Sequence, residues 1–331
     1  MKTQAGFTLV ELMISLALGL LISAAAIMLF LTAQRSYTLQ QGMADLQDNA
    51  NFGLNYITKD IRLTNLNVAE AEINDQSSYG GIVLTSSVNA TTDTTYTPPR
   101  PLSNLFRTIV GNSAGVNLLS RSDGMTVGTA PAWTGASNVL LSAGGGLSSD
   151  QLTIQYTNTT GEVLFDCEGM RVEVNDRAIE RYFLRASSVA SQGIILACDA
   201  GRIVDTGIQD YSSANALNFG SHNSEFISGV DQFKVMLGTQ DTSATPQMRY
   251  VTAAQYMTLS PRPAITAVKI GLIVRGNNLV IGSNTQQSFD VFATTHTLKS
   301  GQPKQVRTNY ESTTLLRNAR VVSVDVSLPN T

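Results

Sequence analysis

The chain begins with one long apolar segment. Residues 12–34 carry no charge, and a helix over the 20 residues 12–31 would be about 30 Å long, the thickness of the hydrocarbon core of a bilayer. A single acid, Glu11, stands at the start of this segment, and a short polar stub that contains Lys2 precedes it. The pattern predicts a helix that spans a membrane.

A helical pattern continues beyond the apolar segment. Apolar residues recur at three- and four-residue steps, which places them in one stripe on one face of a helix. The stripe consists of Leu39, Met43, Leu46, Ala50, Leu54, Ile57 and Ile61. Asn65 and Asn67 are suited to stop the helix. We therefore predict one helix over residues 7–66, about 90 Å long, whose second half packs under a globular domain or forms a coiled coil.

The remaining residues, 67–331, predict β structure. Short β-branched runs separated by turn residues are typical of antiparallel strands. These runs are 152–156, 163–165, 179–184, 193–196, 233–237, 268–274, 313–316 and 321–326. A glycine-rich stretch, 111–149, is either a surface insertion or a join between two β lobes. The predicted fold class is α+β: a long N-terminal helix packed on a mostly antiparallel β head.

Small residues stand before the apolar segment rather than after it. A secretory signal places its cleavage site after the apolar region, which is then lost. Here the small-residue junction lies at Ala5, Gly6 and Phe7. Cleavage at this junction would leave the apolar helix on the mature protein.

The sequence GFTLVE followed by an apolar run resembles the leader of type IV prepilins. The resemblance implies a leader over residues 1–6, cleavage by a prepilin peptidase between Gly6 and Phe7, and N-methylation of the new terminus at Phe7. It also matches Glu11 to the acid at the fifth position of the mature chain. In a pilin, the large part after the helix lies in the periplasm, and Lys2 lies on the cytoplasmic side.

The charge of Glu11 requires either an opposite charge as a partner or a position at the membrane surface. A charged side chain at the centre of a membrane helix costs roughly 2.5–3.5 kcal/mol on insertion scales. Cleavage before Phe7 would create a cationic amine one helical turn away. We interpret Glu11 as the partner of that amine on the same or a neighbouring subunit, where pairing would set the register of assembly. The alternative is that Glu11 reaches the lipid headgroups and has no role.

The chain has two cysteines, Cys167 and Cys198. They have no Cys-x-x-Cys spacing for zinc, and acidic neighbours disfavour a reactive thiol. An exported, oxidising location makes a disulfide the expected state, and closing a loop of about 30 residues stabilises a fold by roughly 3–4 kcal/mol in the chain-entropy model. The alternative is two free buried thiols.

Further segments resemble the PilW minor pilins along the whole chain. They are DNANFGLNYITKDIRL at 48–63, FDCEG and LACDA around RYFLR, FISGVDQFKVMLG at 226–238, AVKIGLIVRG at 267–276 and TTLLRNAR at 313–320. The chain departs from the expected pattern at LTNLN, where a glycine-containing turn would end the helix.

The PilW resemblance implies a role in initiating type IV pilus assembly, in or near the tip. The implied partners are the prepilin peptidase, other minor pilins, the major pilin, a tip adhesin and the inner-membrane assembly platform. Through the pilus it implies twitching motility, adhesion and DNA uptake. Two alternatives share the leader: a minor pseudopilin of type II secretion, and a tip adhesin that binds a surface ligand.

Composition argues against other functions. The net charge of −3 and the absence of a basic patch disfavour direct nucleic-acid binding. A G-x-S-x-G sequence at 111–115 lacks the helix that a nucleophile elbow requires. His222, read as a loop residue, and His296, read as a strand residue facing solvent, are too few for a zinc site. We expect no enzyme activity, metal or cofactor. We interpret Trp133 and Tyr96 as aromatics that cover the β core; the alternative is that they contact a partner.

Overall fold

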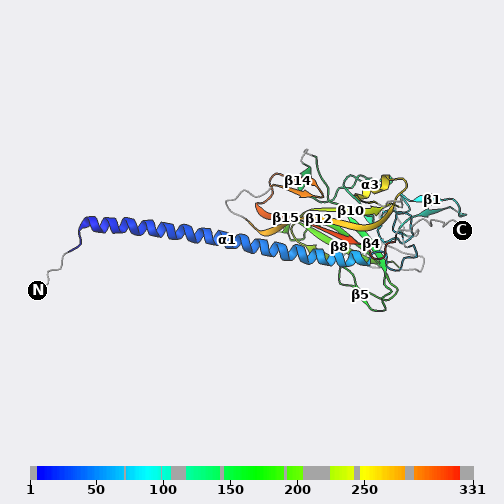
Figure 1. Ribbon diagram of the computed structural model, residues 1–331, viewed down its shortest axis with the longest axis horizontal. Helices are drawn as coiled ribbons and strands as arrows, with labels where there is room; N and C mark the ends of the chain where they lie inside the picture. The colour runs from blue at the N-terminus through cyan, green and yellow to red at the C-terminus, as the bar shows by residue number, and fades with distance from the viewer. Residues whose placement is uncertain are drawn as a thin grey trace, which may run out of the picture.

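The computed structural model describes residues 6–70, 72–97, 99–105, 117–141, 145–189, 192–203, 224–241, 247–279 and 287–320. Its dominant feature is α1, a single helix over Leu9–Leu63 that projects as a rod far beyond a β-rich head (Figure 1). The helix is shorter than the predicted 7–66, because Thr8 caps its start and Thr64 its end. The 6–41 part of the chain is exposed throughout.

The helix ends in an asparagine turn rather than a glycine turn. Asn65 and Asn67 adopt left-handed backbone conformations, with φ of 64° and 53°, a region that asparagine tolerates better than most residues. The Asn65 amide donates to the carbonyls of Glu70 and Asn318, both at 3.2 Å, and accepts from the Gly81 N–H at 2.8 Å. These three hydrogen bonds fix the exit of the chain from the helix.

Gly81 packs directly on this turn, which gives a first prediction. A Cβ at Gly81 would lie 2.4 Å from the backbone nitrogen of Asn65, so Gly81→Ala forces the turn to move. We expect a loss of about 1–3 kcal/mol of stability, the usual cost of overpacking. Thermal unfolding in neutral detergent measures it. Gly146→Ala is the matched control, because nothing lies within 4 Å of its Cβ position; equal midpoints for the two variants would contradict the prediction.

The head is built from antiparallel sheets. One four-stranded sheet has the order β4-β7-β8-β9, and the other has the order β11-β10-β12-β15. The first comprises β4 (Leu152–Thr157), β7 (Arg177–Ala186), β8 (Ile194–Ile203) and β9 (Ser224–Ile227). The second comprises β10 (Val230–Gln240), β11 (Met248–Val251), β12 (Ala264–Leu279) and β15 (Gln305–Leu315). The fold class is therefore α+β as predicted, with a long apolar helix and an antiparallel β head.

Smaller elements complete the head. A three-stranded sheet has the order β13-β14-β3, and two short hairpins pair β1 with β2 and β5 with β6. Their bounds are β1 (Thr91–Asp93), β2 (Arg100–Leu102), β3 (Val139–Leu141), β5 (Leu164–Phe165), β6 (Arg171–Val172), β13 (Ser288–Val291) and β14 (Thr294–Leu298); α3 covers Ala253–Thr258. Every predicted run overlaps a strand except 321–326, which lies outside the described residues.

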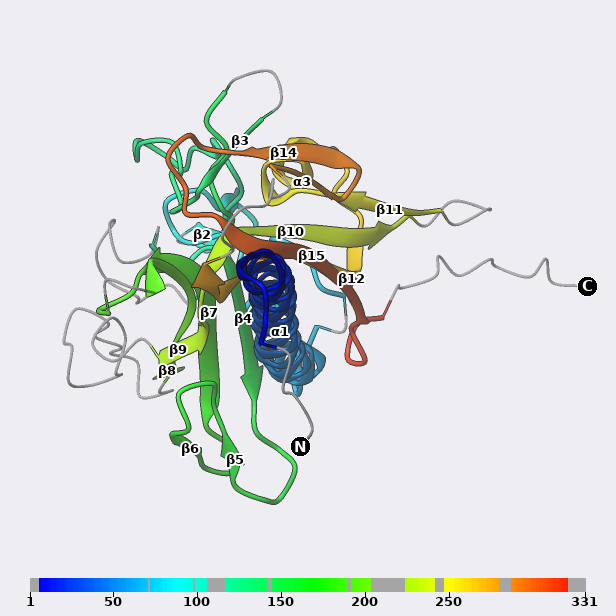
Figure 2. The same cartoon turned by 90° about the vertical axis from the view of Figure 1, so that its left-hand side faces the viewer.

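The second half of α1 lies between the two four-stranded sheets (Figure 2). Five residues of the predicted stripe are buried there. They are Leu46, Ala50, Leu54, Ile57 and Ile61. Leu39 and Met43, at the N-terminal end of the stripe, remain 38% and 40% exposed. The head thus covers the stripe, and each fully buried Leu or Ile contributes about 1.5–3 kcal/mol to holding the helix.

The described part of the glycine-rich stretch belongs to the body of the head. Leu119 and Val127 are buried in the main core, and β3 pairs with β14. Trp133 is partly buried, and its Nε1 donates to the carbonyl of Ser149 at 2.7 Å. Tyr96, by contrast, is 47% exposed.

Candidate functional site

The first functional feature is the uncovered half of α1. Among the described residues, α1 is the one helix long and apolar enough to cross a membrane, and its apolar part is not buried by the head. Exposed leucines, isoleucines and phenylalanines over some thirty residues are unfavourable in water. This half of the helix therefore belongs in a membrane or against other apolar helices.

Glu11 takes part in the start of the helix. Its Oε2 accepts from the Thr8 N–H at 2.9 Å and from the Thr8 hydroxyl at 2.8 Å, while the Thr8 hydroxyl accepts from the Glu11 N–H at 3.3 Å. This reciprocal arrangement is a capping box. The T-x-x-E spacing within GFTLVE is the sequence signal of this cap.

The predicted cleavage junction lies just outside the helix. Gly6 has no atom within 4 Å of its Cβ position, and Phe7 is 89% exposed. Both residues precede Thr8 and are not helical. The peptide bond between them is accessible to an enzyme, and cleavage there would place an amine beside the Thr8–Glu11 cap.

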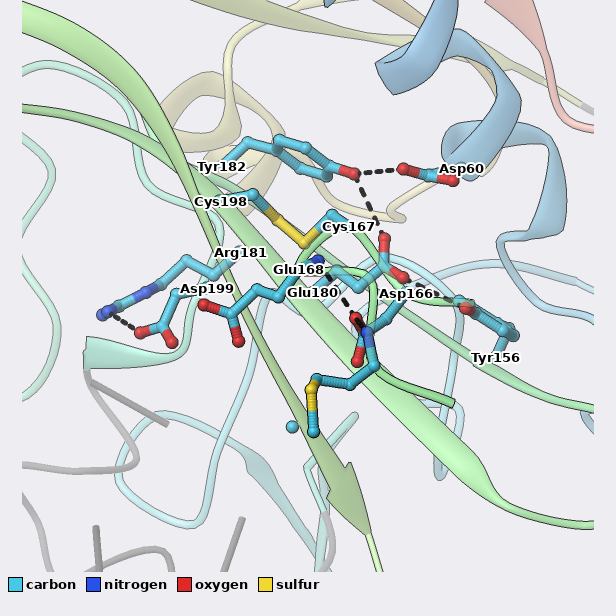
Figure 3. Close-up of a disulfide and its surroundings, with 12 residues drawn as sticks. Asp60, Tyr156, Asp166, Cys167, Glu168, Glu180, Arg181, Tyr182, Cys198 and Asp199 are labelled. Atoms are coloured by element: carbon cyan, nitrogen blue, oxygen red, sulfur yellow. Dashed lines mark hydrogen bonds and ion pairs between the residues drawn. A yellow bond between two sulfur atoms is a disulfide. The ribbon is translucent and has the colours of Figure 1, made fainter. Parts of the chain in front are cut away.

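A buried network of acids and phenols joins α1 to the head (Figure 3). Asp60 of α1 accepts from the Tyr182 hydroxyl at 2.7 Å. The Tyr182 hydroxyl also lies 3.1 Å from Oε2 of Glu180, whose Oε1 accepts from the Tyr156 hydroxyl at 3.0 Å. All four side chains are at most 2% exposed. Residues 180 and 182 share one face of β7 because side chains alternate along a strand.

Proton counting decides the charge state of this network. A phenol has one proton, so Tyr182 can donate to only one of the two carboxyl groups beside it. If it donates to Asp60, the closer group, the contact with Glu180 requires a proton on Glu180. Burial, followed by the nearby Asp60 and Asp166, raises the pKa of Glu180 well above its ordinary value. Burial also raises the pKa of Asp60 to about 6, against the opposing Tyr182 hydrogen bond.

The predicted disulfide is present between Cys167 and Cys198. Cys167 follows β5, and Cys198 lies in the middle of β8 directly opposite Tyr182 of β7. The bridge therefore ties the β5–β6 hairpin to the sheet beside the acid network (Figure 3). An ion pair between Arg202 and Asp166, at 2.8 Å, holds the same hairpin.

Of the histidines considered as candidates, the structure describes His296. His296 lies on β14 and is buried rather than facing solvent as predicted, because its side chain lies near residues of the head such as Leu147 and Lys234. Burial and the nearby Lys234 lower the pKa of His296 to about 4. His222 and the G-x-S-x-G sequence lie outside the described residues. Within the described ranges no group of three or more His, Cys, Asp and Glu side chains could hold a metal ion.

Comparison with known proteins adds two family matches and one structure. Residues 199–318 match the family described as Type IV Pilus-assembly protein W, and residues 1–27 match the prokaryotic N-terminal methylation motif. A solved type IV-like pilin from Thermus thermophilus is 16% identical; the similarity covers 57% of this chain and 87% of that one, with a TM-score of 0.28. No curated protein matches the sequence.

Proposed function

We propose that this chain, a type IV pilin-like protein with a PilW domain, is a minor pilin that helps to initiate assembly of a type IV pilus. In this proposal it waits in the inner membrane with its head in the periplasm. It then enters the filament in or near the tip, and supports twitching motility, adhesion and DNA uptake through the pilus. Other minor pilins, the major pilin, a tip adhesin and the assembly platform are its proposed partners.

One observation carries the proposal. The methylation motif leads directly into an exposed apolar half-helix, which is continuous with a half-helix locked inside the head. Withdrawing the apolar half from the membrane into a bundle of similar helices would carry the head with it, because no break separates the halves. A chain built in this way is suited to be a filament subunit rather than an enzyme.

Processing and charge pairing complete the proposal. A prepilin peptidase would cut between Gly6 and Phe7 and methylate the new amine. The amine would then face Glu11 of the same or a neighbouring subunit, beside the Thr8 cap. An unpaired carboxylate in apolar surroundings is costly, so the pair would favour one register of the helices.

The proposal is tested by the mature terminus and by filament number. Mass spectrometry of the native protein should find a methylated Phe7 as the first residue, and a deletion strain should have few or no pili. A native chain that begins downstream of the apolar segment would contradict it. Normal piliation with lost attachment would instead indicate a tip adhesin, and normal piliation with lost protein secretion a pseudopilin.

Glu11 variants separate charge pairing from helix capping. Glutamine can keep the capping box with Thr8 but has no charge, whereas alanine loses both. We expect Glu11→Gln and Glu11→Ala each to reduce recovery of the protein in sheared filaments roughly tenfold or more, since about 1.4 kcal/mol already corresponds to tenfold. Thermal unfolding of the head should be unchanged. Normal recovery of Glu11→Gln would assign the role of Glu11 to the cap alone.

A further inference from the structure

A cavity of about 440 Å³ opens on the head beside α1. Its wall is formed by α1, by the loop that follows β5, and by β9. Six of its residues define what we call the aromatic groove: Phe52, Tyr56, Phe165, Glu168, Glu225 and Phe226. The volume lies within the roughly 300–1,000 Å³ of pockets that accept a bound ligand, so it has room for one long side chain and its flanking residues.

The rings of the groove form a row that is open to solvent. The centroids of Phe52 and Tyr56 are 5.3 Å apart, and those of Tyr56 and Phe226 are 5.6 Å apart in an edge-to-face arrangement. Phe52 is nevertheless 66% exposed, and Phe165, which also lines the groove, is 56% exposed. Contiguous exposed aromatic side chains are typical of a surface that contacts a partner.

The charges of the groove favour a cationic partner. Glu168 and Glu225 line it, and only one cation, Lys59, does so among the described residues. Oε1 of Glu168 is buried and has no hydrogen-bond partner within the described ranges. Burial, with smaller contributions from the neighbouring carboxylates Asp199 and Asp166, raises the pKa of Glu168 to about 7. An incoming cation would give Oε1 a charged partner, in addition to the hydrogen bonds that this carboxyl group makes with the backbone of Ala200 and Ser224.

The groove already holds one cation against a ring. The Lys59 ammonium lies 5.7 Å from the centroid of Tyr56, within the range of a cation–π contact. Aromatic faces combined with carboxylates are the chemistry that recognises lysine and arginine side chains. We propose that the aromatic groove receives a lysine or arginine side chain from a helix of a neighbouring pilin-type subunit.

The position of the groove on α1 favours a helix as its binding partner. Phe52 and Tyr56 lie on α1, so the groove is continuous with the uncovered face of that helix, against which neighbouring subunits pack in the proposed function. This inference rests on that function for the identity of the partner, but the affinity of the groove for a cationic helix does not depend on pilus assembly. The chemistry is therefore testable with the protein alone.

The test uses two matched peptides and the full chain in neutral detergent. One probe is an amphipathic helix of leucine and lysine, and the other has glutamate in place of lysine. We expect the lysine peptide to bind at least tenfold more tightly. Phe52→Ala and Glu225→Lys should each weaken its binding about fivefold, as expected for a loss near 1 kcal/mol.

The controls are an exposed apolar residue and an exposed acid remote from the groove. Met248→Ala, on β11, and Asp290→Lys, on β13, should bind the lysine peptide like the wild type. Equal affinity for the two peptides would overturn the proposal, as would groove variants that bind like the wild type. This assay involves no filament, so a negative result contradicts the groove proposal alone. Normal piliation of a deletion strain would instead contradict the proposed function.

A photo-reactive residue in place of Phe165 identifies the occupant in cells. Mapped cross-links within one helical turn of a lysine or arginine of a subunit with a methylation motif would support the inference. A second copy of this chain, joined through its exposed Arg35, would also support it. Cross-links to lipid alone, or to segments without a basic residue, would overturn it.

Discussion

Glu180→Gln should make the protein more stable at neutral pH and should reduce the loss of stability as the pH rises. Glutamine can accept from the Tyr156 hydroxyl through Oε1 and donate to the Tyr182 oxygen through Nε2, so it reproduces the neutral form of Glu180. The variant retains the hydrogen bonds of the network and removes the ionisable group. We expect this to be the larger of the pH effects in the head.

The sign follows from the direction of the pKa shift. Burial raises the pKa of Glu180 in the folded protein well above its ordinary value of 4.5. As the pH rises, the unfolded chain releases this proton near pH 4.5, before the folded protein does. The favourable contribution of Glu180 to stability is therefore present below about pH 4.5 and is lost as the pH rises toward the folded pKa. Each retained proton changes the stability by about 1.4 kcal/mol per pH unit. From pH 5 to pH 7 the wild type should therefore lose stability relative to the variant.

The measurement is unfolding of the full chain in neutral detergent at pH 5, 6, 7 and 8. Glu162→Gln, an exposed acid, is the control and should follow the wild type. Asp60→Asn should show a smaller effect of the same sign, between pH 3.8 and about 6. Parallel pH profiles for Glu180→Gln and the wild type would show that no proton is held in the network.

The acid network could not be predicted from the sequence. Asp60 and Tyr182 are 122 residues apart, and Asp60 lies beside charged Lys59 and Arg62 in a segment that predicts solvent exposure. Only the packing of α1 on β7 buries it. Local periodicity does predict the long helix and the β-branched strands, because those signals lie within a few residues of each other.

A missed hairpin shows the limit of turn signals. The strands β13 and β14 are joined by two residues, Phe292 and Ala293, both with left-handed backbone at φ of 52° and 60°. Two-residue hairpins usually place Asn-Gly there, and the sequence VFAT gives no such signal. Tertiary contacts hold this turn instead: the Phe292 N–H donates to Glu311 at 2.7 Å, and the Lys269 ammonium lies 4.7 Å from the Phe292 ring centroid.

The strand β8 extends beyond the run 193–196 that the sequence predicts. The residues ACDAGRI have little β-branched character, yet they continue the strand to Ile203 because each pairs with β7. The same pairing sets Cys198 opposite Tyr182 and so determines which face carries the disulfide. The sequence indicates that the two cysteines pair, and the strand register places the bond beside the network.

Replacing both cysteines, Cys167→Ala with Cys198→Ala, should produce the largest loss of stability among these predictions. The bridge closes a separation of 31 residues, for which the chain-entropy model gives about 3–4 kcal/mol, an upper figure because the model is disputed. Unfolding in neutral detergent, with and without a reducing agent, measures the loss. The reductant should destabilise the wild type and leave the double variant unchanged; a reduced wild type as stable as the oxidised protein would contradict the prediction.

The loss should be concentrated in the β5–β6 hairpin and should reach the aromatic groove. Without the bridge, the hairpin is still held by the Asp166–Arg202 pair and by two N–H groups, of Glu168 and Met170, that donate to Asp166 at 3.0 and 2.9 Å. These contacts restrain the loop but do not join it covalently to β8. Hydrogen exchange should therefore increase first in residues 164–172. The same variant should bind the lysine peptide more weakly, because Phe165 and Glu168 belong to this hairpin; unchanged binding would show that the groove does not need the bridge.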